Sequence, residues 1–178
     1  MCSPEEDVKI FIPDEEDALD SAFSEGERSA AEYVAHRKNG NLEKTRELGE
    51  LLAQTLVGDS QRLEAEPFYH QKLVLLSFLA EDELEAGLPD LLLQKSAVAA
   101  MNRRLEELSP EIHAIVVDST AFTMYILNDR QGEGESEGQV LVRLCDRDDD
   151  EALIRRGDAL TEEYRLLFRE IIESYVFK

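Results

Sequence analysis

Apolar side chains recur every three or four residues along most of this chain, which is the spacing of an α-helix that buries one face. The segment over 67–86 is apolar on nearly every face, so we expect it to be the central helix, with Leu76, Phe78 and Leu79 in the core. The pattern predicts helices over about 24–38, 41–57, 67–86, 90–108, 110–127 and 150–178. We therefore expect an all-α, single-domain helical bundle of about six helices with short connections.

Capping residues mark the boundary between this bundle and the start of the chain. Ser24 and Glu27 have the spacing of a capping box, so we place the start of the first helix there. Gly40 suits the left-handed position that follows the end of a helix. The sequence thus divides into an acidic N-terminal arm over 1–23 and one helical domain over 24–178.

The segment over 112–127 carries conflicting signals. It is rich in β-branched and aromatic residues, which favour a strand, and 139–144 offers a hairpin partner. Ser109 followed by Pro110, however, is a strong start signal for a helix. We expect a helix here, with a small hairpin over 112–146 and an α+β fold as the alternative.

Negative charge is concentrated at two places. The 178 residues carry 40 acids against 19 lysines and arginines, a formal net charge of −21. Ten acids lie within 1–27 beside one lysine, and eight lie within 133–151 beside two arginines. Phosphate binding depends on clustered cations, so this balance argues against nucleic acids and anionic membranes as partners. A solvated acidic arm is the plainest interpretation, and docking to a basic protein is the alternative.

The first residues do not resemble an export signal. Residues 1–6 contain no cation, and the apolar run over 8–12 is short and interrupted by Lys9. No stretch approaches the roughly 20 apolar residues of a membrane span. We therefore expect a cytoplasmic protein in which Cys2 and Cys145 stay reduced.

Two Glu–His pairs at four-residue spacing are candidate metal ligands. Glu32 and His36 lie on one predicted helix, and Glu66 and His70 lie at the start of another. Four-residue spacing places both side chains of a pair on one helix face, so two such helices in contact would offer two imidazoles and two carboxylates to zinc or iron. The di-iron bundle pattern is Glu-x-x-His, one residue shorter, and surface Glu–His contacts are the simpler interpretation. We expect no other cofactor.

The aspartates before the last predicted helix occupy some of the ligand positions of a calcium-binding loop. Asp146, Asp148 and Asp150 occupy its first, third and fifth places. The sixth place requires glycine and is Glu151, and the twelfth requires glutamate and is Gly157. Both departures are structural, so we interpret these aspartates as caps at the positive end of a helix dipole.

The segment over 134–138 matches the G-x-S-x-G pattern of hydrolases letter for letter. That motif requires a sharp turn between a strand and a helix of an α/β sheet, which this chain does not predict. The acidic neighbours of Ser136 would also oppose the formation of an oxyanion. We therefore interpret the segment as a flexible loop rather than a catalytic site.

The last predicted helix has a wider apolar arc than one packing stripe needs. Phe168, Ile172 and Val176 lie beside the stripe and are the only positive indication of a self-association contact. Because no catalytic set is evident, we expect a non-catalytic protein-interaction or self-associating module. A small metal-binding protein or metal-dependent enzyme is the alternative. The stripe itself consists of Leu160, Tyr164, Leu167 and Ile171.

Overall fold

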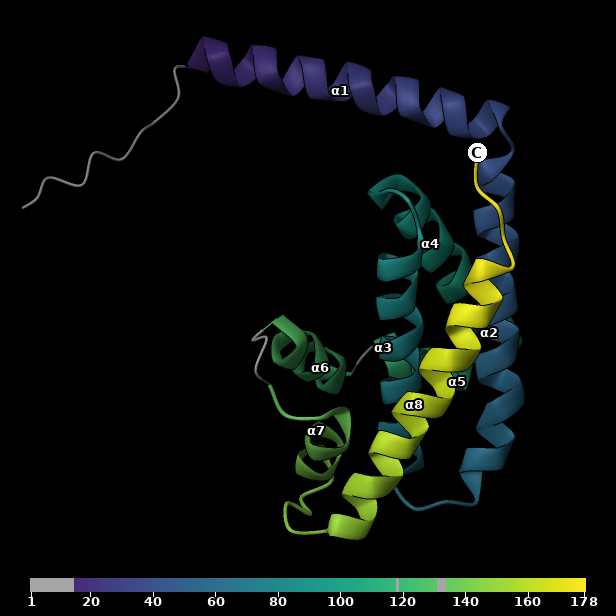
Figure 1. The fold of residues 1–178 in the computed structure, drawn as a ribbon, viewed down its shortest axis with the longest axis vertical. Helices are drawn as coiled ribbons and strands as arrows, with labels where there is room; N and C mark the ends of the chain where they lie inside the picture. The colour runs from purple at the N-terminus through teal and green to yellow at the C-terminus, as the bar shows by residue number, and fades with distance from the viewer. Residues whose placement is uncertain (1–14, 118, 131–133) are drawn as a thin grey trace, which may run out of the picture.

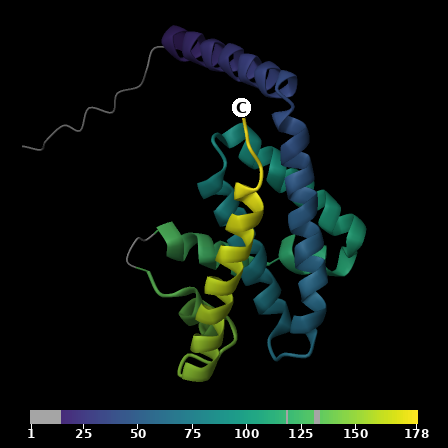
Figure 2. The ribbon, with the colours of Figure 1, turned by 45° about the vertical axis from the view of Figure 1, so that its right-hand side comes forward.

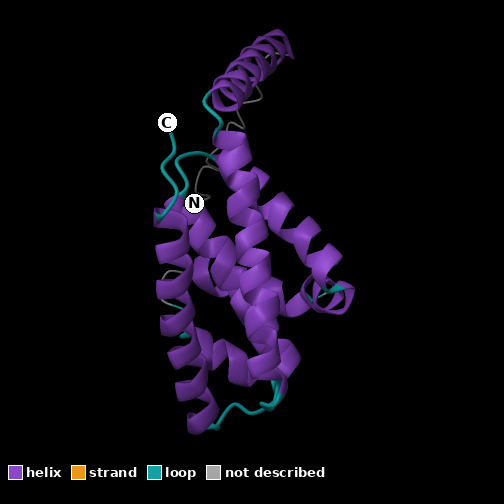
Figure 3. Ribbon diagram, turned by 90° about the vertical axis from the view of Figure 1, so that its right-hand side faces the viewer, coloured by secondary structure: helices purple, strands orange, loops and turns teal. Residues whose placement is uncertain are grey.

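The computed structural model describes residues 15–117, 119–130 and 134–178, and within these ranges the chain is all-α with no strand (Figures 1 and 3). The predicted fold class is confirmed. Helix α3 contacts each of α2 and α4 to α8, so it is the centre of the bundle. The helices in the described ranges are α1 (Glu15–Lys38), α2 (Asn41–Glu64), α3 (Tyr69–Gly87), α4 (Leu91–Leu108), α5 (Pro110–Val117), α6 (Thr120–Arg130), α7 (Glu137–Leu144) and α8 (Glu151–Glu173).

The predicted fifth helix forms, but as two elements. Helix α5 begins after Ser109, whose hydroxyl accepts a hydrogen bond from the amide nitrogen of Ile112 at 3.3 Å. Helix α6 begins after Ser119, whose hydroxyl accepts from the amide nitrogen of Ala121 at 3.2 Å. Each serine satisfies a donor that a helix start leaves open, so the second serine sets a new helix where we predicted a continuous one.

The hairpin alternative over 112–146 is wrong. Its second half forms α7, which opens with a capping box: the Gln139 amide nitrogen donates to the Ser136 hydroxyl at 3.3 Å, and the Ser136 amide nitrogen donates to the Gln139 side chain at 2.8 Å. Val140 and Leu141 are then fully buried on this short helix. Caps and burial therefore outweigh the strand preference of the β-branched residues.

Several predicted helix boundaries differ from the structure, and α8 ends at Glu173 rather than at 178. Helix α1 begins at Glu15, so Ser24 and Glu27 lie inside it, because no proline or glycine between 15 and 23 stops a helix. Helix α2 likewise continues through Gly58, which we expected to end it. Asp14 and the rest of the arm before α1 lie outside the described residues.

The core is centred on α3. Leu76 and Leu79 are 0% exposed and Phe78 is 5% exposed, which confirms their predicted place. The ring of Phe78 stacks on Tyr125 of α6 with 5.3 Å between centroids and meets Phe122 edge-on at 6.0 Å. Aromatic contacts therefore attach α6 to one side of α3.

Glycines allow two pairs of helices to cross closely. A Cβ atom on Gly49 of α2 would lie 2.3 Å from the carbonyl oxygen of Ala97 on α4. A Cβ atom on Gly157 of α8 would lie 2.7 Å from the Cα of Gly138 on α7. No larger residue fits either crossing without displacing backbone. Gly138 of the hydrolase-like pattern, and Gly157, which stands where a calcium loop requires glutamate, are thus packing residues.

The wide apolar arc of α8 belongs to the core. Tyr164 and Phe168 are 0% exposed and Ile172 is 3% exposed, because α8 packs against α2, α3 and α7 rather than against one neighbour. Figures 1 and 2 show α8 lying along the bundle in both views. The self-association contact expected from Phe168 and Ile172 is therefore wrong, and only Val176 of that group is exposed, at 68%.

Helix α1 leaves the bundle and crosses beyond its end (Figures 1 and 2). It has 24 residues, which corresponds to about 36 Å. Its principal contact is with α2, which it meets at its own C-terminal end. Residues 26–35 are exposed throughout. Among the helices that the structure describes, none has the length and apolar character that crossing a membrane requires.

Candidate functional site

The structure separates the candidate metal ligands. His36 lies in the last turn of α1, whereas Glu66 lies in the connection from α2 to α3 and His70 in the first turn of α3. Helix α2 has 24 residues, so about 36 Å separates its two ends. Glu32 is exposed on α1 and lies 3.7 Å from Arg28. The described residues contain no group of three or more His, Cys, Asp or Glu side chains arranged to hold a metal ion.

His36 fixes the root of α1 to the bundle. Its Nδ1 accepts a hydrogen bond from the Asn41 side chain at 3.0 Å, so the ring proton lies on Nε2, which faces the Asp90 carboxylate at 3.0 Å. Asp90 also caps α4 by accepting from the amide nitrogen of Leu93 at 3.0 Å. Asn41 additionally holds the backbone of Lys178. This histidine therefore joins α1, α2 and α4.

Glu66 has an internal role as well. Arg156 of α8 donates to it from Nε at 3.1 Å and from Nη2 at 2.5 Å, and the buried Lys72 ammonium donates at 2.6 Å. Hydrogen bonds from Arg156 and then Lys72 lower the pKa of Glu66 to about 2. Both carboxylate oxygens are engaged, and the carboxylate ties the connection between α2 and α3 to α8.

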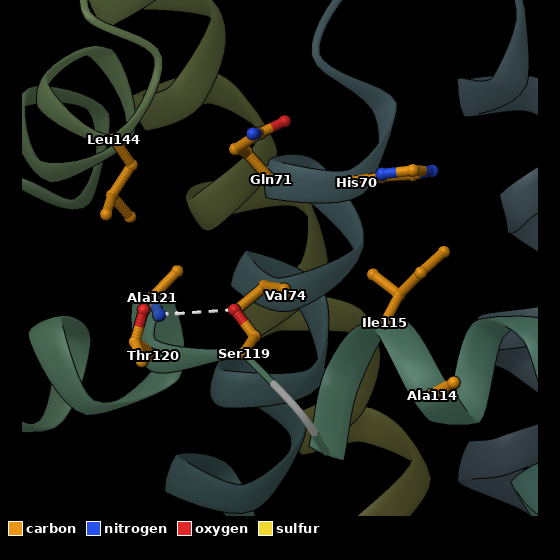
Figure 4. Close-up of a pocket in the computed structure, with 9 residues that line it drawn as sticks. All are labelled: His70, Gln71, Val74, Ala114, Ile115, Ser119, Thr120, Ala121 and Leu144. Carbon is orange, nitrogen blue, oxygen red and sulfur yellow. Dashed lines mark hydrogen bonds between the residues drawn. The ribbon is translucent and has the colours of Figure 1, made fainter.

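A pocket of about 430 Å³ opens beside His70, and Figure 4 shows its lining. The Ser119 hydroxyl in this pocket accepts from the amide nitrogen of Ala121 at 3.2 Å, drawn as a dashed line in Figure 4. The His70 ring points away from Ser119 (Figure 4). The residues that line the pocket therefore assemble no pair of nucleophile and base. The lining consists of His70, Gln71, Val74, Ala114, Ile115, Ser119, Thr120, Ala121 and Leu144.

The hydrolase-like segment is held in place, although we expected a flexible loop. The Asn128 side chain donates to the carbonyl oxygen of Glu135 at 2.6 Å and accepts from its amide nitrogen at 2.9 Å. Ser136 caps α7, and Gly138 is buried and donates its amide to Asp158 at 2.9 Å. Gly132 and Glu133, which precede this segment, lie outside the described residues.

Of the aspartates that we interpreted as caps, Asp150 caps α8 in the described structure, whereas Asp146 and Asp148 lie in the connection before it. Asp150 accepts a hydrogen bond from the amide nitrogen of Leu153 at 3.0 Å, which caps the helix and lowers the pKa of this aspartate.

Cys145 lies just upstream of these aspartates. Burial raises the pKa of the Cys145 thiol to about 11, so the thiol is protonated at neutral pH.

One carboxylate in the bundle has no partner and lies between two grooves. Glu81 of α3 is partly buried, and its side chain forms no hydrogen bond or ion pair with any residue that the structure describes. Burial raises the pKa of Glu81 to about 7. It lines a groove of about 350 Å³ between α3 and α4, and another of about 350 Å³ between α3 and α6. Glu85, one helical turn later, lines both grooves.

Apolar side chains form the walls of these two grooves, which we call the Glu81 grooves. Leu91 of α4 is 61% exposed, and Val98 lies further along the same wall, half-buried. Phe122 and Ile126 of α6, also half-buried, form the opposite wall. The charged groups at the edges are Asp82, Glu85, Lys95, Asp129 and Arg130.

Sequence analysis did not single out Glu81. What could have indicated this residue is its position: it is an acid that directly follows the continuously buried run 72–80 in the helix expected to be most buried.

Comparison of the chain with protein-family models, with curated proteins and with solved structures finds no match. In the described part of the chain, helix α1 projects from the bundle (Figure 1) and the Glu81 grooves lie on its surface.

Proposed function

We propose that this chain is a non-catalytic protein-interaction module that engages its partner through α1. The observation that carries the proposal is the exposure of α1 outside the bundle, including Tyr33 at 46% and Val34 at 62%. An isolated helix is marginal in water, and most helices in proteins are stabilised by packing one face. A long helix with exposed aromatic and β-branched side chains therefore fits a helix that packs against another polypeptide.

The anchored root of α1 supports the same proposal. His36 and Asp90 tie the last turn of α1 to the start of α4, so the helix leaves the bundle in a set direction. A binding element held in advance loses less conformational entropy when a partner docks. We place this activity in the cytoplasm, the compartment expected from the sequence.

Photo-crosslinking tests the role of α1. A photoreactive residue at position 33 of the full chain should give adducts with one polypeptide in cells, and mass spectrometry distinguishes a second copy from another protein. Val34→Asp should lower the adduct yield about tenfold, because it places a charge in the contact. Since Val34 is exposed, thermal stability should not change.

Position 166 provides the matched control. Leu166 of α8 is 54% exposed, comparable to Tyr33, but it lies on the bundle rather than on α1. A photoreactive residue there should give few adducts. Equal yields at the two positions, or an unchanged yield with Val34→Asp, would contradict a contact through α1.

A further inference from the structure

We propose that the Glu81 grooves bind a basic amphipathic segment of a partner protein, with a lysine or arginine side chain placed against the Glu81 carboxylate. This site is separate from α1, and the two proposals stand or fall independently.

The geometry provides both parts of such a contact. Glu81 and Glu85 lie one turn apart on α3 and form a ridge with a groove on each side. Exposed and half-buried apolar side chains of α4 and α6 form the outer walls. An amphipathic segment that lies across this ridge would place apolar side chains in the grooves and a cation over the carboxylates.

The charge of the molecule indicates which kind of segment would bind in the Glu81 grooves. A partly buried carboxylate without a partner is unfavourable, and a cation that pairs with it restores the lost interaction. The chain's own residues 1–14 carry four acids and one lysine, and a second copy carries a net charge of −21. Both would be repelled by the acidic ridge, which leaves a basic foreign segment as the complementary occupant.

The affinity of the Glu81 grooves for such a segment should change with pH around neutrality. Its pKa is raised to about 7 by burial, so part of the population is uncharged at neutral pH. Of the charged groups around it, Asp82 is engaged by Arg165, whereas Glu85, Lys95, Asp129 and Arg130 form no ion pair in the described structure. A bound cation favours the carboxylate, so affinity should rise with pH from about 6 to about 8.

Fluorescence anisotropy with a labelled amphipathic peptide of leucine and lysine tests this inference on the full chain. Wild-type affinity should increase about tenfold between about pH 6 and pH 8. Glu81→Gln should bind about tenfold more weakly at pH 8 and should lose this pH dependence. A peptide with acetylated lysines, which keeps the length but not the charge, should bind the wild type as weakly as the lysine peptide binds Glu81→Gln.

Controls separate a site from general attraction to an acidic protein. Glu106→Gln makes the same charge change at an exposed position towards the far end of α4 and should leave binding unchanged. Leu91→Lys should abolish binding by placing a cation at the exposed wall, and it serves as the second variant if Glu81→Gln does not fold. Val34→Asp should bind the peptide normally, whatever its effect on adducts from α1. Equal losses in Glu81→Gln and Glu106→Gln, or wild-type binding by Leu91→Lys, would overturn the proposal.

Discussion

Glu81 and Glu83 lie two residues apart on α3 and have opposite surroundings. Glu83 is 4% exposed, and its oxygens accept hydrogen bonds from Arg165 and Arg169 of α8, each at 3.1 Å. Glu81 lines the grooves beside α4 and α6, and it forms no ion pair in the described structure, although Arg130 lies at the edge of one groove. A strongly buried carboxylate is thus fully paired on one side of α3, while a less buried one has no partner on the other.

The difference shows which side of α3 is joined to neighbouring helices by ion pairs. On the α8 side, Arg165 also binds Asp82 and lies 2.8 Å from Glu137 of α7, so a single guanidinium connects α3, α7 and α8. Charges paired in this way offer little to a ligand, and removing one partner would leave a buried charge without compensation. On the other side lie apolar walls and an unpaired carboxylate, the surface that we propose for a basic segment.

The largest effect on stability should come from breaking the ion pairs on the side of α3 that faces α8. Glu83→Ala should lower the free energy of unfolding by about 3 kcal/mol, because it leaves the two arginines without a shared buried acceptor. Urea denaturation at neutral pH measures this cost. Glu85→Ala, an exposed control one turn from Glu81, should change stability by less than about 0.5 kcal/mol. A cost below about 1 kcal/mol for Glu83→Ala would show that the network does not stabilise the bundle.

A smaller change in stability, of opposite sign, should come from Glu81 on the side of α3 that faces the grooves. Because burial raises the pKa of Glu81 from 4.5 to about 7 in the folded chain, its ionisation opposes folding, and wild-type stability should fall as pH rises from about 4.5 to about 7. Glu81→Gln should therefore be more stable than the wild type at pH 8, on the order of 1–2 kcal/mol. Below the pKa of an unfolded glutamate the two proteins should be alike. Urea denaturation at several pH values checks this, and a constant difference across pH would refute it.

The fold was largely predictable because the helical spacing of apolar residues and the local capping residues determine it. The central place of Leu76 follows from a helix that is apolar all round, and the caps at Ser109 and Asp150 follow from residue type. The arc that includes Phe168 was misassigned because its width reports the number of neighbouring helices, which spacing along one helix does not reveal.

The candidate site was not predictable for a related reason. Glu81, Asp82 and Glu83 are consecutive acids, and nothing in their order shows which of them meets the arginines of α8. That outcome depends on how α8 is rotated and placed against α3. The same limit applies to the Glu–His pairs, since four-residue spacing sets a shared helix face but not which helices meet across it.

The finest test compares two buried tyrosines, one on each side of α3. The Tyr164 hydroxyl of α8 donates to Asp59 at 2.9 Å and accepts from Arg62 at 2.9 Å, whereas the fully buried Tyr125 hydroxyl of α6 has no partner in the described residues. Tyr164→Phe should cost about 1 kcal/mol. Tyr125→Phe should be neutral or stabilising by up to about 1 kcal/mol, because it removes an unsatisfied polar group. Thermal unfolding should resolve the pair as shifts of about 2–4 °C in opposite directions. Equal destabilisation by both substitutions would mean that the α6 side is as fully hydrogen-bonded as the α8 side.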